Sequence, residues 1–173
     1  MDITSYLLGK QSSGGGGGGG GSDLDWTAIG YTKRPQAINE EYAYALEIKN
    51  NWVPATSLNK KFQNDANLYF MPLVDTSTTT NFNSMFRDCY QLTTIPILDM
   101  SQATSFNYMF YECSVLSDES LNNILQMAIN ATSYTGAKYL TQFGFSSSYY
   151  PATRIQSLSN YQAFIDAGWT IGY

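Results

Sequence analysis

Hydrophobic and polar residues recur along the middle of the chain with a period of 24 residues. When residues 68–93 are aligned with residues 92–117, eleven of the twenty-six pairs are identical and no gap is needed. The identical pairs are Leu68/Leu92, Pro72/Pro96, Asp75/Asp99, Ser77/Ser101, Thr80/Thr104, Phe82/Phe106, Asn83/Asn107, Met85/Met109, Phe86/Phe110, Cys89/Cys113 and Leu92/Leu116. A period in the low twenties is typical of chains built from stacked coils, in which each coil buries its apolar side chains against the next.

The first part of each repeat has the apolar spacing of a leucine-rich repeat, which predicts a β-strand along one wall of the coil. Alternation along that strand predicts an inward and an outward set of residues. The inward set is Met71, Leu73, Ile95 and Ile97. The outward set, our candidate contact face, is Phe70, Pro72, Val74, Thr94, Pro96 and Leu98. Because an exposed apolar patch marks a contact site, we expect a ligand, the N-terminal segment or a copy of the chain to cover this face.

The second part of each repeat is expected to form the opposite wall of the coil. Its phenylalanine and methionine residues recur at i, i+3 and i+4, which predicts a short helical turn with one apolar face. These residues are Phe82, Met85 and Phe86 in one repeat and Phe106, Met109 and Phe110 in the next. Two roles stay open for Asn83 and Asn107 in the same turns: polar spacers, or side chains that bond backbone groups left free between coils.

Other elements are predicted on both sides of the two full repeats. Residues 52–67 form a degenerate first repeat, in which Phe62 precedes Phe86 by 24 residues and Lys60 and Lys61 face water. The remaining predictions are a strand at 26–31, a helix at 40–49 with Asn39 as N-cap, a helix at 118–130 capped by Ser117, a strand at 139–145, a helix capped by Ser157 or Ser159 and ending at Gly168, and a strand at 169–171.

Composition divides the chain into three parts. Residues 1–11 contain a short apolar group, Tyr6, Leu7 and Leu8, which either binds a partner surface or stays disordered, because so short a segment is marginal alone. Residues 12–22 include eight consecutive glycines and are predicted to be a linker. The remainder forms one domain, divided into an N-terminal cap with the degenerate repeat at 23–67, two full repeats at 68–117 and a C-terminal cap at 118–173.

The repeat pattern P-x-L-D-x-S-x-x-T-x-F-N-x-M-F-x-x-C-x-x-L resembles the BspA-like, mycoplasma-lipoprotein type of leucine-rich repeat. The resemblance is strong over residues 68–117 and weaker over residues 51–67. Proteins of this type occur on the surface of gut and oral bacteria and in phages that infect them. The resemblance implies an α/β fold class: a short leucine-rich-repeat solenoid with a parallel sheet, 24-residue coils and a helical cap at each end.

Both ends of the chain resemble phage proteins as well. Residues 116–136 and 158–173 are similar to the closing segment of phage-borne members, and residues 1–10 to the N-termini of virion-associated proteins of phages of Gram-positive gut bacteria. This resemblance favours the N-terminal peptide as an anchor to other virion proteins. An ordered polyglycine bundle, as in some trimeric phage fibres, leaves a homotrimer as an alternative.

Charge and hydropathy exclude several function classes. The net charge is −5, and the nine basic residues are scattered rather than gathered in the stripe that nucleic acid requires. No apolar run approaches the ~20 residues of a membrane span, and residues 1–10 lack the pattern of a secretory signal. Aromatic residues make up 15% of the chain, mostly tyrosine. Antibody paratopes are also rich in tyrosine, which gives a large contact area at low entropy cost. The alternative is that uncharged polar residues merely suit the surface of stacked coils.

The sequence offers no catalytic or metal-binding constellation, so we predict no enzymatic activity and no cofactor. Histidine is absent, which removes the usual base and metal ligand. Cys89 and Cys113 stack in the repeat; a coil-interior position and cytoplasmic assembly favour free thiols over a disulfide. Asp75 and Asp99 would lie ~4.8 Å apart on adjacent coils, near the spacing of a retaining glycosidase pair. An aspartate shortly before a serine at a strand end nevertheless favours an Asx-turn.

These observations favour a non-enzymatic phage virion protein, of the tail-fibre or accessory-adhesin type, that displays a leucine-rich-repeat head for attachment to a host surface protein or glycan. We expect it in the virion, after assembly in the host cytoplasm. One alternative is a purely structural virion accessory protein. Another is a bacterial cell-surface or secreted interaction protein.

Overall fold

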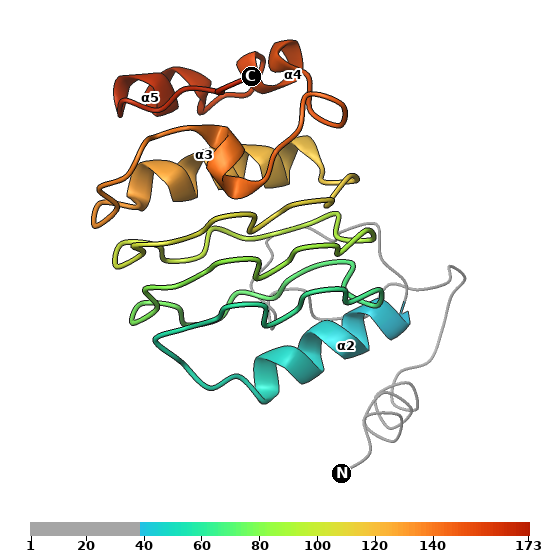
Figure 1. Cartoon of the computed structure of the whole chain (residues 1–173). Helices are drawn as coiled ribbons and strands as arrows, with labels where there is room; N and C mark the ends of the chain where they lie inside the picture. Colours follow the sequence, from blue (N-terminus) through green and yellow to red (C-terminus); the bar gives the residue numbers. More distant parts are fainter. Residues whose placement is uncertain (1–38) are drawn as a thin grey trace, which may run out of the picture.

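The computed structural model describes residues 39–173 of the chain. The predicted anchor residues Tyr6, Leu7 and Leu8, the linker at 12–22 and the strand at 26–31 lie outside the described residues. Between its terminal helices the described chain winds in coils stacked one above the other (Figure 1). Parallel bridges join Ser57 to Asn81, Asn81 to Ser105 and Phe70 to Thr94. Each pair is 24 residues apart, so the period of the sequence is the period of the coils.

The wall formed by residues 82–89 is a run of turns, and the predicted helical turn is wrong. Every second N–H group donates to the next coil, over 2.7–2.9 Å: Phe82 to Ser105, Ser84 to Asn107, Phe86 to Met109 and Asp88 to Tyr111. The N–H groups between them donate within their own coil: those of Met85, Arg87 and Cys89 to the carbonyl three residues earlier, and that of Asn83 to the side-chain oxygen of Asn81. Ser84 and Asp88 have left-handed backbone, with φ of 53° and 62°. A helix would use the N–H groups beyond its first turn internally, and these could then not join one coil to the next.

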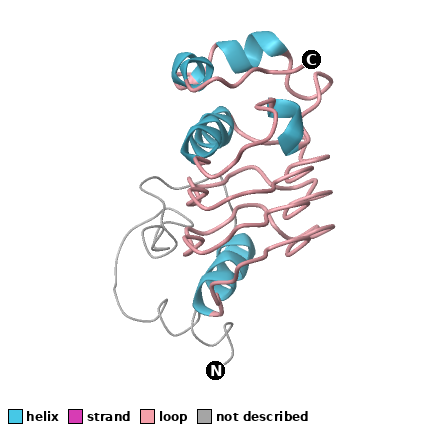
Figure 2. Cartoon of the chain, turned by 60° about the vertical axis from the view of Figure 1, so that its left-hand side comes forward, coloured by secondary structure: helices cyan, strands magenta, loops and turns pink. Residues whose placement is uncertain are grey.

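The opposite wall contains no continuous strand within residues 39–173, and Figure 2 draws the coils as loop throughout. The expected parallel pairing is present there as the single bridge between Phe70 and Thr94. Leu92, Ile95 and Leu98 are all buried, so the apolar period is three rather than two. Three residues per turn is the period of polyproline II. Proline at position 96 favours that backbone, because it biases the residue before it towards the β and polyproline II regions.

This change of period reverses part of the predicted core. Leu73 and Ile97, predicted to point inward, are each 42% exposed. Met71 and Ile95 are buried, as predicted. The inward assignment is therefore right for the residue before each proline and wrong for the residue after it.

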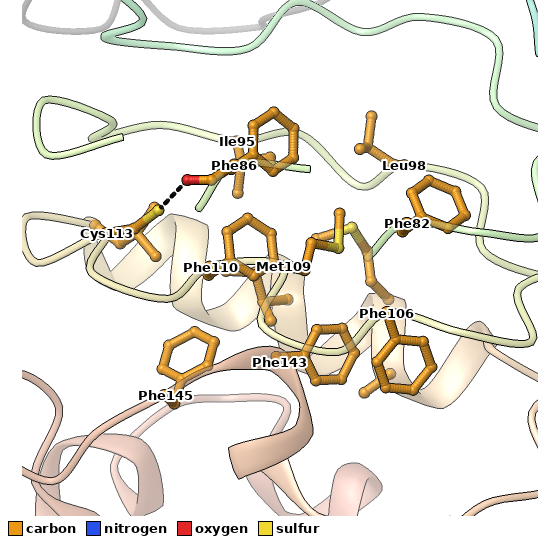
Figure 3. Close-up of a cluster of buried hydrophobic side chains, with 14 of the residues drawn as sticks. Phe82, Phe86, Ile95, Leu98, Phe106, Met109, Phe110, Cys113, Phe143 and Phe145 are labelled. Atoms are coloured by element: carbon orange, nitrogen blue, oxygen red, sulfur yellow. Dashed lines mark hydrogen bonds between the residues drawn. The ribbon is translucent and has the colours of Figure 1, made fainter. Parts of the chain in front are cut away.

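A ladder of phenylalanine rings runs through the stack, one ring per coil. Phe62, Phe86, Phe110 and Phe143 follow one another with ring centroids 5.8, 5.4 and 6.4 Å apart and interplanar angles of 20° or less. Figure 3 shows the last three of these rings among the buried side chains. The predicted apolar wall is thus confirmed as core, although turns rather than a helix present it.

Polar side chains join the coils at their corners. The hydroxyl groups of Thr80 and Thr104 donate to the carbonyls of Thr56 and Thr80, over 3.1 and 3.2 Å. The side-chain oxygen of Asn83 accepts the Asn107 N–H at 2.7 Å. Of the two roles left open for Asn83, the structure supports the bond to a backbone group of the next coil.

Helix α2, Asn39–Asn50, lies at the N-terminal end of the stack (Figure 1) and matches the helix predicted at 40–49. Beyond it, the indole N–H of Trp52 donates to the Asp75 carbonyl at 2.8 Å. The Lys49 ammonium donates to the Leu73 carbonyl at 3.1 Å. These bonds attach the end of the helix to the coil above it.

Helix α3, Asp118–Asn130, follows the last full repeat and confirms the helix predicted at 118–130. The Ser117 hydroxyl accepts the Ser120 N–H at 3.2 Å, as expected of an N-cap. Its buried face contains the predicted stripe of Leu121, Ile124, Leu125 and Ala128.

Two side chains of α3 close the open edge of the last coil. The Ser120 hydroxyl donates to the Thr93 carbonyl at 2.9 Å and accepts the Ile95 N–H at 3.0 Å. The Asn123 amide donates to the Ile95 carbonyl at 2.9 Å. These groups would otherwise need a further strand, and pairing them blunts an edge that could pair with another chain.

The C-terminal elements differ from their predictions in three places. The segment predicted as a strand at 139–145 contains the 3-10 helix η2, Leu140–Phe143, because its carbonyls cap the turn wall of the last coil. The predicted last helix corresponds to the short helix α5 (Tyr161–Asp166), and a further short helix that was not predicted, α4 (Ala152–Gln156), precedes it. Asn160 rather than a serine precedes α5, and Gly168 follows it with φ of 85°. The strand predicted at 169–171 is a single bridge between Tyr139 and Thr170.

Candidate functional site

The residues of the predicted contact face are largely buried, and the outward assignment of Leu98 is wrong because Leu98 packs in the main core cluster. Phe70 is 2% exposed and Leu98 is fully buried. Pro72 and Pro96 are also buried, and Val74 and Thr94 are half-buried. The three-residue period explains the error at Leu98, which follows Ile95 by one turn of that period. The six residues do not form an exposed surface.

A group of exposed aromatic side chains lies instead at the edge where the turn wall ends. Four tyrosines lie there: Tyr90, Tyr108, Tyr111 and Tyr149, with exposed fractions of 53%, 56%, 37% and 38%. We call them the tyrosine patch. The rings of Tyr108 and Tyr111 meet edge to face with centroids 5.9 Å apart. Tyr90 and Tyr108 thus keep more than half of their surface, and Tyr111 and Tyr149 more than a third, available for a partner.

Three charged residues lie among these rings. Arg87 forms an ion pair with Asp88, over 3.2 Å, and its guanidinium lies 5.1 Å from the centre of the Tyr111 ring. The Tyr149 hydroxyl donates to the Glu112 carboxylate at 2.6 Å. The guanidinium and the Tyr149 ring are thus held in place by contacts within the chain.

The turn wall itself brings these residues together. Asp88 and Glu112 occupy the same left-handed position of successive coils, with φ of 62° and 61°. The Asp88 N–H donates to the Tyr111 carbonyl at 2.8 Å, which fixes one coil against the next beneath the patch. Residues 24 apart in the repeat therefore become neighbours along this edge.

The carboxylates of the patch raise the pKa values of two of its tyrosines. Asp88 is the main cause for Tyr90, with a further contribution from Glu112. For Tyr149 the main cause is the hydrogen bond to Glu112. Both phenols therefore remain protonated at neutral pH: Tyr149 donates its hydrogen bond to Glu112, and Tyr90 can donate one to a ligand.

Three of the four patch hydroxyls are available to a ligand. Those of Tyr90, Tyr108 and Tyr111 bond to no other residue of the described chain. Within the same residues, Glu112 uses one carboxylate oxygen for Tyr149 and leaves the other free. The patch thus combines exposed ring surface with unused donors and acceptors.

Pattern analysis of the sequence missed this patch because it followed the positions that the two repeats share. The patch comes from positions where they differ: Ser84 against Tyr108, Arg87 against Tyr111, Asp88 against Glu112 and Tyr90 against Ser114. A constant framework with variable positions on one edge is the signal that would have located it. The abundance of tyrosine pointed to contact without saying where.

The aspartates considered for catalysis have a structural role. One oxygen of Asp75 accepts the N–H and hydroxyl groups of Ser77, and one of Asp99 accepts the Ser101 N–H. These are the predicted Asx-turns, and the bonds to Ser77 lower the pKa of Asp75. Residues 39–173 hold no group of three or more metal-ligating side chains and no helix long and apolar enough to cross a membrane.

Both cysteines are free and buried, as predicted. The Cys89 thiol donates to the Phe62 carbonyl at 2.9 Å, and the Cys113 thiol to the Phe86 carbonyl at 3.0 Å (Figure 3). Burial raises the pKa of Cys89 from 9.0 to about 12 and that of Cys113 well above its ordinary value. A nucleophilic role is therefore unsupported, because the thiolate is the reactive form.

We expect both thiols to resist Ellman's reagent at pH 8 in the native protein and to react after unfolding in urea. The raised pKa also sets a pH dependence, since the unfolded thiol ionises near 9.0 and the folded Cys89 thiol near 12. The protonated Cys89 thiol therefore contributes its full stabilisation below pH 9.0, and this stabilisation is lost as the pH rises towards about 12. The urea concentration at the midpoint of unfolding should accordingly decrease as the pH is raised above 9. Rapid native reaction at pH 8 would contradict the buried position.

Comparison of the chain with protein-family models, with curated proteins and with solved structures finds no match.

Proposed function

We propose that the protein is a non-enzymatic binding protein that contacts its partner through the tyrosine patch. The observation that carries this proposal is the gathering of Tyr90, Tyr108, Tyr111 and Tyr149 on one edge, all more than a third exposed. Tyrosine and arginine are enriched where proteins bind one another, because they combine large contact area with hydrogen bonding. A coil edge that served only to stack would not need four exposed aromatic rings.

In this proposal the coils are a short leucine-rich-repeat solenoid of the BspA-like type. Support comes from the repeat pattern of residues 68–117 and from the parallel bridges at 24-residue spacing. Helices at both ends cover the first and last coils, as repeat arrays require of their terminal units.

The setting we propose is a phage virion, in which residues 1–11 join the head to other virion proteins and residues 12–22 act as a linker. The resemblance of both chain ends to phage proteins supports this setting. The tyrosine patch would then face the host cell or another particle surface, and attachment or decoration would be its function.

The double substitution of Tyr90→Ser with Tyr111→Ser tests the proposed contact. Labelled full-length protein would be incubated with a panel of Gram-positive gut bacteria, and the bound fraction measured against concentration. We expect the wild type to bind at least one strain. The double variant should bind that strain with an affinity at least about tenfold lower, which is the size of effect that the loss of interface hot spots produces. Tyr139→Ser is the matched control, because Tyr139 is 45% exposed and lies outside the patch.

The control should bind like the wild type, and all three proteins should unfold at similar urea concentrations. Binding that the double variant retains in full would place the contact elsewhere on the chain. Absence of binding by the wild type to every strain would favour a purely structural accessory role.

A further inference from the structure

Resting on the binding role above, we infer that the tyrosine patch takes a neutral polysaccharide, with sugar rings lying on the tyrosine faces and sugar hydroxyls bonded to Glu112 and the tyrosine hydroxyls. The inference depends on three properties of the patch: its ring faces, its unused hydrogen-bonding groups and its charge.

The ring faces match the apolar side of a sugar. A pyranose ring presents C–H groups on its faces and hydroxyls around its rim. The face of an aromatic ring carries negative charge density and attracts such positively polarised hydrogens. Tyr90 and Tyr108 expose over half of their surface, so their rings are open to this contact.

The unused polar groups match the rim of a sugar. A carboxylate accepts hydrogen bonds only, and those it accepts from hydroxyl groups are short and strong. One carboxylate oxygen of Glu112 accepts the Tyr149 hydroxyl, and the second oxygen has no partner in the described chain. The free hydroxyls of Tyr90 and Tyr111 can each donate and accept a hydrogen bond, so they can pair with sugar hydroxyls acting as acceptors or as donors.

The charge of the patch selects against acidic polymers. Its charged groups are two carboxylates and one guanidinium, and that guanidinium is already paired with Asp88 and lies against Tyr111. An anionic polymer would meet net negative charge without a free cation. A hydrophobic peptide is also disfavoured, because the patch residues are tyrosines and charged residues rather than an apolar groove.

The arrangement also favours a polymer over a single sugar. Tyr90 and Tyr111 belong to successive coils, and the Glu112–Tyr149 pair continues the patch to the C-terminal cap. Coils joined by backbone hydrogen bonds repeat about every 4.8 Å. A chain lying along the stack can thus meet one contact after another.

Affinity electrophoresis of the full-length protein tests the ligand class. Native gels would contain neutral polysaccharides (dextran, galactan or glucomannan) or acidic ones (dextran sulfate or polygalacturonate). We expect at least one neutral polymer to retard the wild type and no acidic polymer to do so. Tyr90→Ser with Tyr111→Ser should raise the dissociation constant on the order of tenfold, Glu112→Gln should raise it less, and Tyr139→Ser should leave it unchanged. Retardation by acidic polymers alone, or by none, would overturn the inference.

Treating the bound bacteria separates failure of this inference from failure of the proposed function. Periodate cleaves the vicinal diols of sugars, whereas protease removes surface proteins. Loss of patch-dependent binding after periodate, with protease having no effect, supports the polysaccharide. Loss after protease alone would overturn the polysaccharide and leave the binding role intact. Binding that does not depend on Tyr90 and Tyr111 would overturn the role itself.

Discussion

Substituting Phe110→Ala should lower the free energy of unfolding by about 3–5 kcal/mol, the range found when a buried aromatic ring is truncated. Phe110 is 1% exposed and stacks between Phe86 and Phe143, so its removal interrupts the ring ladder between the last full coil and the C-terminal cap. A loss of that size approaches the whole stability of many domains. Urea unfolding followed by tryptophan fluorescence measures it.

Tyr90→Ala is the matched control for the ladder. Tyr90 is an aromatic residue near the end of the previous coil, but it is 53% exposed and should cost no more than about 0.5 kcal/mol. If Phe110→Ala cost less than about 1 kcal/mol, the ring would not be part of a packed core.

Substituting Gly144→Ala should be destabilising by about 2–5 kcal/mol for two separate reasons. Gly144 has φ of 90°, a left-handed conformation that costs other residues about 1–2 kcal/mol. An added Cβ would also lie 2.7 Å from the Tyr111 nitrogen and 2.9 Å from its Cα. Because both are backbone atoms, the clash cannot be relieved by a side-chain movement and adds about 1–3 kcal/mol.

Gly168→Ala separates these two reasons. Gly168 has a similar φ of 85°, but its nearest neighbour would be the flexible side chain of Lys138, 3.8 Å from the new Cβ. This variant should therefore cost only about 1–2 kcal/mol, from backbone conformation alone. Equal losses for the two variants would contradict the close packing of Gly144 on the coil that contains Tyr111.

The register and the helices flanking the coils could be predicted from the sequence. The 24-residue period located the coils because a packed interior admits only similar side chains at equivalent positions, such as Phe86 and Phe110. Helices α2 and α3 were predictable from local signals, since Ser117 caps an amphipathic stripe.

The orientation of residues along the first wall could not be predicted from alternation. Alternation assumes a pleated strand, whereas the prolines at positions 72 and 96 bias the chain towards a three-residue period. Leu98 was consequently assigned to solvent although it is buried. The helical turn predicted for the other wall was wrong for a related reason, because apolar spacing at i, i+3 and i+4 does not distinguish a helix from successive turns.

The tyrosine patch depends on contacts between coils, which no single repeat specifies. Arg87 meets Tyr111 only because the coils stack, and Tyr149 reaches Glu112 from 37 residues further along the chain. Such a surface becomes visible once the fold is known.

The coils stack in a 24-residue register and so assemble the patch from residues of successive coils. The most direct test is a measurement of scalar couplings across hydrogen bonds in labelled full-length protein by NMR. The structure predicts couplings from the amide nitrogens of Ser84, Phe86 and Asp88 to the carbonyl carbons of Asn107, Met109 and Tyr111. Couplings from those nitrogens to carbonyls four residues earlier would show helices in place of turns and would contradict the stacked coils.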